Sequence, residues 1–365
     1  MRLKTATICT VLLSTIFAAA RAQEAHLLLT PQHLKRLQRD RQRQTVRWLN
    51  FENRVQSVPD SPQRGFELAL YYAITHDQAR GREAIAWALA HPCDPRQTPQ
   101  ILDWSGDLIS ESERAKIPAC QPAPTAENLL TALQNGAFRD APTLYAACEY
   151  LMTVRATEHT DLRQNAPQFF SRLPVEFLLS LKPAQIDHPD WMTHIAALAL
   201  VALDPNLEAS QFLQAWAIED RQMLRDGPGV AYEFLWADPY LPGVGYQNLD
   251  PWTYAAPTGR LFARTNWDTN ACWIAISPHG VEEQNCPSGW RDQLARFGRL
   301  NLLPMTQRCE ELPSFEPNSS LLLWRLPPGQ SVSYRDNKQP RSGQADPAGL
   351  LRISPGAQGK VCAAR

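Results

Sequence analysis

The feature that most constrains this chain is a change in the spacing of its apolar residues near Gly227. Before that point apolar residues recur at helical spacing, and after it they come in short runs that Pro and Gly interrupt. The first pattern is typical of helices and the second of strands joined by turns. The sequence therefore predicts an α+β multidomain protein, with a helical domain over residues 24–226 and an antiparallel β domain over residues 227–365.

The helical part should contain roughly eight to ten helices, joined by short proline-rich loops that favour antiparallel hairpins. No repeat of fixed length is present, so we expect an irregular α/α toroid-like array rather than a solenoid. The runs 260–266 and 271–277 are among the strands expected afterwards, and they favour a small antiparallel β-sandwich.

The N-terminal residues predict a secretory signal peptide over residues 1–22. Basic residues follow Met1, an apolar segment runs from Ile8 to Ala20, and Ala20-Arg21-Ala22 resembles a cleavage site. No later stretch approaches the roughly 20 apolar residues that a membrane span requires. We therefore expect a secreted or periplasmic protein with no membrane span after signal cleavage.

Export makes disulfides the expected state of the cysteines. Cys9 leaves with the signal peptide. The pairings we consider are Cys93–Cys120, Cys286–Cys309 and Cys272–Cys362, with Cys148 as a buried thiol, although spacing alone does not fix the connectivity. Neither C-x-x-C nor H-x-x-x-H occurs, so we predict no metal site and no cofactor. The net charge of -1 argues against a nucleic-acid partner.

Two patches of sequence resemble a known family. A helix pair of these proteins is similar to Ile101-Leu102-Asp103-Trp104 with the following residues 108–114. The first strands of their sheet domain are similar to residues 261–268 with Trp273-Ile274-Ala275-Ile276. The family is that of the heparinase II/III-like and alginate-lyase-like polysaccharide lyases. The resemblance covers most of the mature chain. It implies an α/α toroid, a β-sandwich and β-elimination on an acidic, uronic-acid polysaccharide or oligosaccharide at the junction of the two domains.

The chain departs from that family at one motif. A His-x-His-x-Asp-like motif supplies the family's catalytic histidine, and the corresponding residues 288–294 keep Asp292 but contain no histidine. His279 lies nearby, upstream of that stretch. The departure favours the alternative of a non-catalytic glycan-binding or surface-interaction protein on the same scaffold, and whether the chain is an enzyme stays open. A glycoside hydrolase would need two converging carboxylates, and no spacing singles out such a pair.

Candidate site residues come mainly from the dense aromatic stretch 227–278. β-Elimination needs a cation to neutralise the carboxylate, a base and an acid. We predict Tyr254 and His279 as catalytic residues and Arg264 as a carboxylate ligand, because packing explains these three least. The other predicted substrate-binding residues are Tyr240, Trp252, Arg260, Trp290 and Asp292. Tyr232 and Tyr246, like Tyr240 and Tyr254, could also serve as acid or base, and Trp236 and Trp267, like Trp252 and Trp290, could stack on a sugar ring. Packing between the domains is the alternative role for Trp236, Trp267 and Trp273. The alternative is that Arg264 has a structural role, in an ion pair with Asp268 or Asp103.

Overall fold

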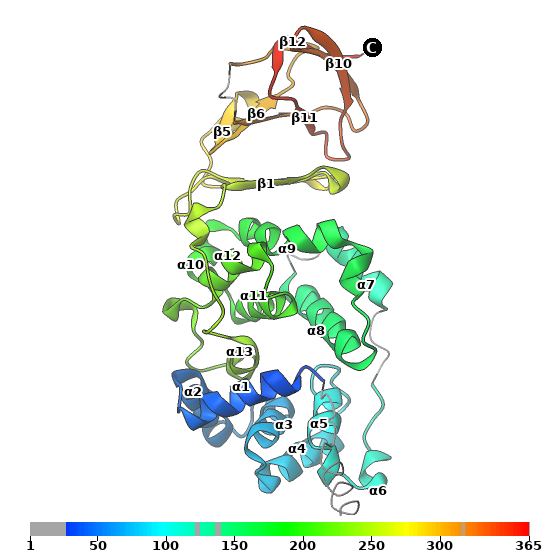
Figure 1. Ribbon diagram of the computed structural model, residues 1–365, viewed down its shortest axis with the longest axis vertical. Coiled ribbons are helices and arrows are strands. Elements are labelled where there is room, and N and C mark those ends of the chain that lie inside the picture. The colour runs from blue at the N-terminus through cyan, green and yellow to red at the C-terminus, as the bar shows by residue number, and fades with distance from the viewer. Residues whose placement is uncertain (1–26, 121–124, 136–139, 315, 317, 365) are drawn as a thin grey trace, which may run out of the picture. The chain divides into compact units, whose positions relative to one another are not determined.

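A computed structural model of the chain describes residues 27–120, 125–135, 140–314, 316 and 318–364 (Figure 1). The predicted signal peptide, with Cys9, lies outside the described residues. The chain divides into two compact units, Met1–Ala123 with Met152–Asp161 and Pro124–Leu151 with Leu162–Arg365. The units therefore do not divide at residue 226. The change from helices to strands does fall close to it, between Trp236 and Trp252. Helices and sheets together confirm the α+β multidomain class, whereas the toroid stays a prediction.

The first unit is helical, and α3 is its central element. α3 is buried along most of its length and packs against α1, α2, α4 and α5. Thr30 caps α1 with its side chain, and Ser110 with Glu113 forms a capping box at α6. Cys93 and Cys120 form the predicted disulfide. The elements are α1 (Pro31–Gln42), α2 (Val46–Ser57), α3 (Arg64–Thr75), α4 (Gln78–Ala90), α5 (Thr98–Trp104), η1 (Gly106–Leu108) and α6 (Glu111–Arg114).

The helices of the second unit surround α11. The run Ile195–Val201 is buried throughout, because α11 packs against α9, α12 and α13. Cys148 is a buried free thiol, as predicted. The elements are α7 (Ala126–Gln134), α8 (Ala141–Thr157, shared with the first unit), η3 (Leu162–Asn165), α9 (Pro167–Ser180), α10 (Pro183–Asp187), α11 (Trp191–Leu203), α12 (Glu208–Ala217), η4 (Asp220–Gln222), α13 (Val230–Trp236) and η5 (Tyr246–Asn248).

Within the described residues, the strands of the second unit form three four-stranded sheets. The first has the order β1-β2-β3-β4 and is antiparallel throughout. The second has the order β11-β8-β6-β5, in which β6 and β8 pair in parallel, and the third has the order β10-β9-β12-β7. The strands are β1 (Trp252–Ala255), β2 (Arg260–Arg264), β3 (Trp273–Ser277), β4 (Gly280–Gln284), β5 (Ala295–Phe297), β6 (Leu300–Pro304), β7 (Cys309–Glu311), β8 (Ser320–Trp324), β9 (Ser331–Asp336), β10 (Gln339–Gln344), β11 (Leu351–Ile353) and β12 (Ala357–Ala363).

The second sheet is a middle layer, as the alternation of side chains in β8 shows. Leu322 and Trp324 belong to a core shared with the first sheet, whereas Leu321 and Leu323 belong to a core shared with the third. Successive side chains of a strand point to opposite faces, so β8 is buried on both. The first sheet lies between this middle layer and the helices of its own unit (Figure 1), and α9 packs against β1 and β2. The strands thus form three layers with one parallel pair, rather than a purely antiparallel sandwich.

The remaining disulfides differ from the predicted pairs. Cys272 bonds to Cys286 and Cys309 bonds to Cys362, so the predictions Cys286–Cys309 and Cys272–Cys362 were wrong. The register explains the difference: Cys272 and Cys286 flank the hairpin in which Trp273 pairs with Gln284. Cys309 and Cys362 lie directly opposite each other in the third sheet. Over the described residues, no helix has the length and apolar character needed to cross a membrane.

Candidate functional site

The structure places Tyr254 and Arg264 on opposite faces of the first sheet. Tyr254 pairs with Leu261 across β1 and β2, and both pack toward the core shared with the second sheet. Arg264 pairs with Trp273, whose indole nitrogen donates to the Leu179 carbonyl of α9 at 2.8 Å. Arg264 therefore faces the helices, because directly opposed residues of antiparallel strands share a face.

His279 is also far from Arg264. It is exposed in the turn between β3 and β4, next to Ser277. Arg264 lies opposite Trp273, at the other end of β3, so the strand rise separates the two positions by roughly 13 Å. The three residues that packing seemed to explain least, Tyr254, Arg264 and His279, therefore do not face one cleft.

Tyr254 has a structural partner. Its hydroxyl donates to Asp346 Oδ2 at 2.8 Å, and burial together with this carboxylate raises the pKa of Tyr254 well above its usual value. Asp346 Oδ1 also accepts from the backbone nitrogens of Ala348 and Leu350, so the pair fixes the turn before β11. A phenol held protonated in this way is a poor general base.

We expect Tyr254→Phe to lower the free energy of unfolding by about 1 kcal/mol, the usual loss for one hydrogen bond. Ligand binding should not change. Urea denaturation and calorimetry check the two parts. A variant that unfolds like the wild type but no longer binds ligand would show that Tyr254 belongs to the ligand-binding site.

Arg260 is buried in a structural ion pair. Its Nη2 lies 3.2 Å from Glu176 Oε2 of α9, and its Nη1 donates to the carbonyls of Leu133 and Gln134 at 3.2 and 2.7 Å. These contacts tie the first sheet to α7 and α9. The side chain is 5% exposed, so it has no donor left at the surface for a substrate.

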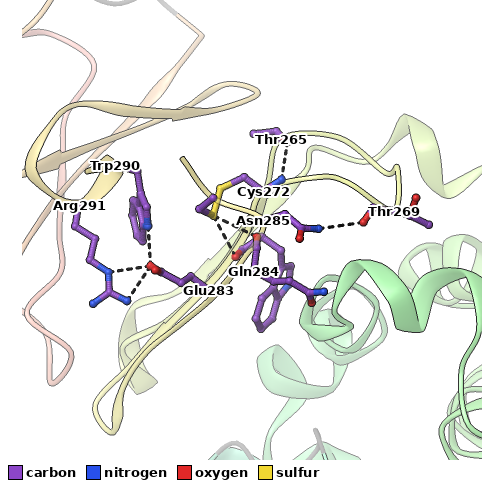
Figure 2. Close-up of a disulfide and its surroundings, with 10 residues drawn as sticks. Thr265, Thr269, Cys272, Glu283, Gln284, Asn285, Trp290 and Arg291 are labelled. Atoms are coloured by element: carbon purple, nitrogen blue, oxygen red, sulfur yellow. Dashed lines mark hydrogen bonds and ion pairs between the residues drawn. A yellow bond between two sulfur atoms is a disulfide. The ribbon is translucent and has the colours of Figure 1, made fainter. Parts of the chain in front are cut away.

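The other predicted binding residues are dispersed. Tyr240 is exposed in the loop after α13, and Trp252 packs against the core beneath the first sheet. Trp290 is buried, stacks on Trp324 with ring centroids 5.4 Å apart, and donates to Glu283 at 2.6 Å (Figure 2). Asp292 pairs with Arg325 at 2.7 Å. Packing and local ion pairs account for Trp252, Trp290 and Asp292.

A different set of residues forms a cavity of about 570 Å³ in the second unit, which we call the Trp267 cavity. It is built by the end of α10, by η4 and η5, and by the loop between β2 and β3. Its lining combines aromatic rings with planar polar side chains. The lining residues are Asp187, Arg221, Tyr246, Gln247, Trp267, Asp268, Thr269 and Asn270.

Arg221 is the paired cation of this cavity. It forms ion pairs with Asp187 and with Glu219, and its Nη2 donates to the Tyr246 hydroxyl at 3.1 Å. Burial alone would lower the pKa of Arg221, but the hydrogen bonds to Glu219 and Asp187 outweigh it and raise the pKa. The charge of Arg221 is therefore already compensated by the protein.

Tyr246 stands against Trp267, with ring centroids 5.1 Å apart at 79°. Burial, followed by the charge of Glu219, raises the pKa of Tyr246, and Arg221 offsets only part of this effect. The hydroxyl is therefore held protonated. It can donate a hydrogen bond to a ligand, but it is poorly suited to remove a proton.

Arg264 contacts the Trp267 ring but does not itself line the cavity, and it is a cation without a hydrogen-bond partner among the described residues. Its side chain is fully buried, and its guanidinium carbon lies 4.5 Å from the centroid of the Trp267 ring. None of its three side-chain nitrogens has a hydrogen-bond partner in the part of the chain that the structure describes, and the Trp267 indole nitrogen is likewise without an acceptor there. Burial lowers the pKa of Arg264 to about 10, and Tyr246 and Asp187 counter this only in part.

Comparisons with known proteins do not add to this geometry: no protein-family model matches the chain, and no curated protein matches it. The resemblance to polysaccharide lyases therefore stays a prediction. Among the described residues, no group of three or more His, Cys, Asp or Glu side chains could hold a metal ion.

The sequence located part of the cavity but missed its helical side. Tyr246 and Trp267 lie in the aromatic stretch 227–278, and Arg264 was a predicted carboxylate ligand. Asp187, at the end of α10, and Arg221, in the middle of η4, lie outside that stretch. Nothing in their sequence neighbourhood distinguishes them from ordinary surface charges, so only the fold brings them to Tyr246.

Proposed function

We propose that this protein is exported and binds a carbohydrate that carries a carboxylate, in the Trp267 cavity. The observation that carries this proposal is the buried guanidinium of Arg264, which lies behind the Trp267 ring and has no hydrogen-bond partner within the described part of the chain. Buried charges in proteins are ordinarily paired, because an isolated charge is costly to remove from water. A ligand carboxylate would supply the missing partner and accept two N–H donors from one guanidinium.

The rest of the lining suits a sugar. Trp267 and Tyr246 offer apolar ring surface, and Asp187, Asp268 and Asn270 offer acceptors for sugar hydroxyls. Because Arg264 is fully buried, Trp267 must shift for a carboxylate to reach it. The sugar ring would then contact the indole while its carboxylate meets the guanidinium.

β-Elimination on the same ligand is the second candidate function. It is favoured by Tyr246, whose hydroxyl lies beside Arg221 and could protonate a leaving oxygen. The raised pKa of Tyr246 argues against its acting as the base. For this reason we place non-catalytic binding first.

The proposal retains an α/α toroid for the helices, next to the three layers of strands. Support comes from the order of elements, helices before strands, and from the position of the cavity where the two meet within the second unit. The disulfides Cys93–Cys120, Cys272–Cys286 and Cys309–Cys362 support a secreted or periplasmic location, because such bonds persist in oxidising compartments.

The proposal is tested by calorimetry with a panel of uronic-acid oligosaccharides. We expect at least one to bind, and we expect Trp267→Ala to raise its Kd tenfold or more, equivalent to about 1.4 kcal/mol. Trp87→Ala is the matched control, since Trp87 is half-buried in the first unit and should leave Kd unchanged. Absorbance of unsaturated product, followed in parallel, decides between binding and elimination. Binding of no member of the panel, or equal loss in both variants, would refute the site.

A further inference from the structure

We propose that the Cys272–Cys286 disulfide and Asn285 form a clamp that holds the loop 265–272 in the geometry the Trp267 cavity requires. The loop joins β2 to β3 and contributes Trp267, Asp268, Thr269 and Asn270 to the lining. This inference rests on the proposed function for its ligand, but the clamp itself is a property of the free protein.

The base of the loop is closed by paired contacts. The Thr265 backbone nitrogen donates to the Cys272 carbonyl at 3.0 Å, and the Cys272 nitrogen donates to Thr265 Oγ1 at 3.2 Å. The disulfide then joins Cys272 to Cys286, which lies two residues after the end of β4. The loop is therefore tied both to itself and to the far strand of the hairpin (Figure 2).

Asn285 reaches the far side of the loop. Its amide nitrogen donates to the Thr269 carbonyl at 3.1 Å, next to two lining residues (Figure 2). Asn285 has a φ of 55°, a left-handed conformation that Asn and Asp adopt more readily than other non-glycine residues. The neighbouring Cys286 belongs to the disulfide, so the covalent bond and the hydrogen bond act from adjacent positions.

The clamp explains how an exposed loop can present a binding wall. Residues 268–270 are exposed, whereas Ala271 and Cys272 at the end of the loop are buried. A free loop would have to be ordered when ligand binds, and that entropy loss would weaken binding. Fixing the backbone beforehand leaves mainly the Trp267 side chain to move.

Two sets of variants test the clamp. The double variant Cys272→Ser/Cys286→Ser removes the disulfide. Its matched control, Cys309→Ser/Cys362→Ser, removes a cross-strand disulfide of the third sheet. Asn285→Asp keeps the side-chain shape and the left-handed preference but cannot donate to Thr269. Circular dichroism selects the variants that remain folded.

We expect faster amide exchange at residues 266–271 in both clamp variants without ligand, and ordinary exchange there in the control. With the best-binding uronic-acid oligosaccharide, Kd should rise at least tenfold without the Cys272–Cys286 bond, about threefold in Asn285→Asp and less than twofold in the control. Unchanged exchange in both clamp variants, or faster exchange with unchanged Kd, would overturn the clamp. If the wild type binds no oligosaccharide, the proposed function fails, and the exchange data alone decide whether the loop is clamped.

Discussion

Arg264→Met is expected to raise the free energy of unfolding by about 1–3 kcal/mol, even though the residue is completely buried. Lowering the pKa of Arg264 from 12.5 to about 10 corresponds to a penalty of about 3 kcal/mol for the charged form. Because the folded-state pKa is lowered, the penalty is fully present at neutral pH and declines only as the pH rises above about 10. Methionine fills similar space without a charge, and the lost contact with Trp267 offsets part of the gain.

Urea denaturation of the ligand-free protein at pH 7 measures this effect. Arg341→Met is the matched control, because Arg341 is exposed and lies 3.9 Å from Asp336, and such surface changes stay within about 0.5 kcal/mol. A clear loss of stability in Arg264→Met would mean that the protein already compensates this charge, and the site would lose its main argument.

Arg260→Met is expected to have the opposite effect, lowering the free energy of unfolding by about 3–5 kcal/mol. The change removes the contacts to Leu133 and Gln134 and leaves Glu176 buried, with Arg172 3.8 Å away as its remaining ion-pair partner. Burial already raises the pKa of Glu176 against the effect of Arg260. With only the more distant Arg172 left to compensate it, the Glu176 carboxylate would take up a proton or destabilise the fold.

A double variant separates the ion pair from simple packing. Arg260→Met/Glu176→Gln removes both charges, so it should be more stable than Arg260→Met alone. Denaturation midpoints of the two single variants and the double variant give the coupling between the residues. A double variant no more stable than Arg260→Met would show that the backbone contacts, rather than the ion pair, hold the first sheet to the helices.

Arg260 and Arg264 show how far the sequence could predict the site. Both lie on the same face of β2. In the sequence both occupy equivalent positions in one run of alternating apolar and polar residues, so the sequence does not show that only Arg260 has a carboxylate partner. Glu176 lies far along the chain, and only the packing of α9 brings it to Arg260. The structural role of Tyr254 could not be predicted for the same reason, because its partner Asp346 lies in a turn far along the chain.

The fold was more accessible to prediction than the site. Apolar spacing located the change from helices to strands, and the runs near Arg260 and Trp273 became β2 and β3. The layering was not predictable, because β8 is apolar at every position except Ser320 and the run alone does not show which sheets cover it. The prediction of two disulfides was wrong for a related reason, because strand register rather than sequence spacing decides which cysteines lie opposite each other.

The central claim is that the Arg264 guanidinium binds a ligand carboxylate, and one calorimetric comparison tests it most directly. The best-binding uronic-acid oligosaccharide, and the same oligosaccharide with its carboxylates reduced to alcohols, are titrated into the wild type and Arg264→Met. We predict that the wild type binds the acid at least tenfold more tightly than the alcohol, and that Arg264→Met binds both with the same weak affinity. Equal binding of the two ligands by the wild type, or an undiminished preference for the acid in Arg264→Met, would contradict the claim.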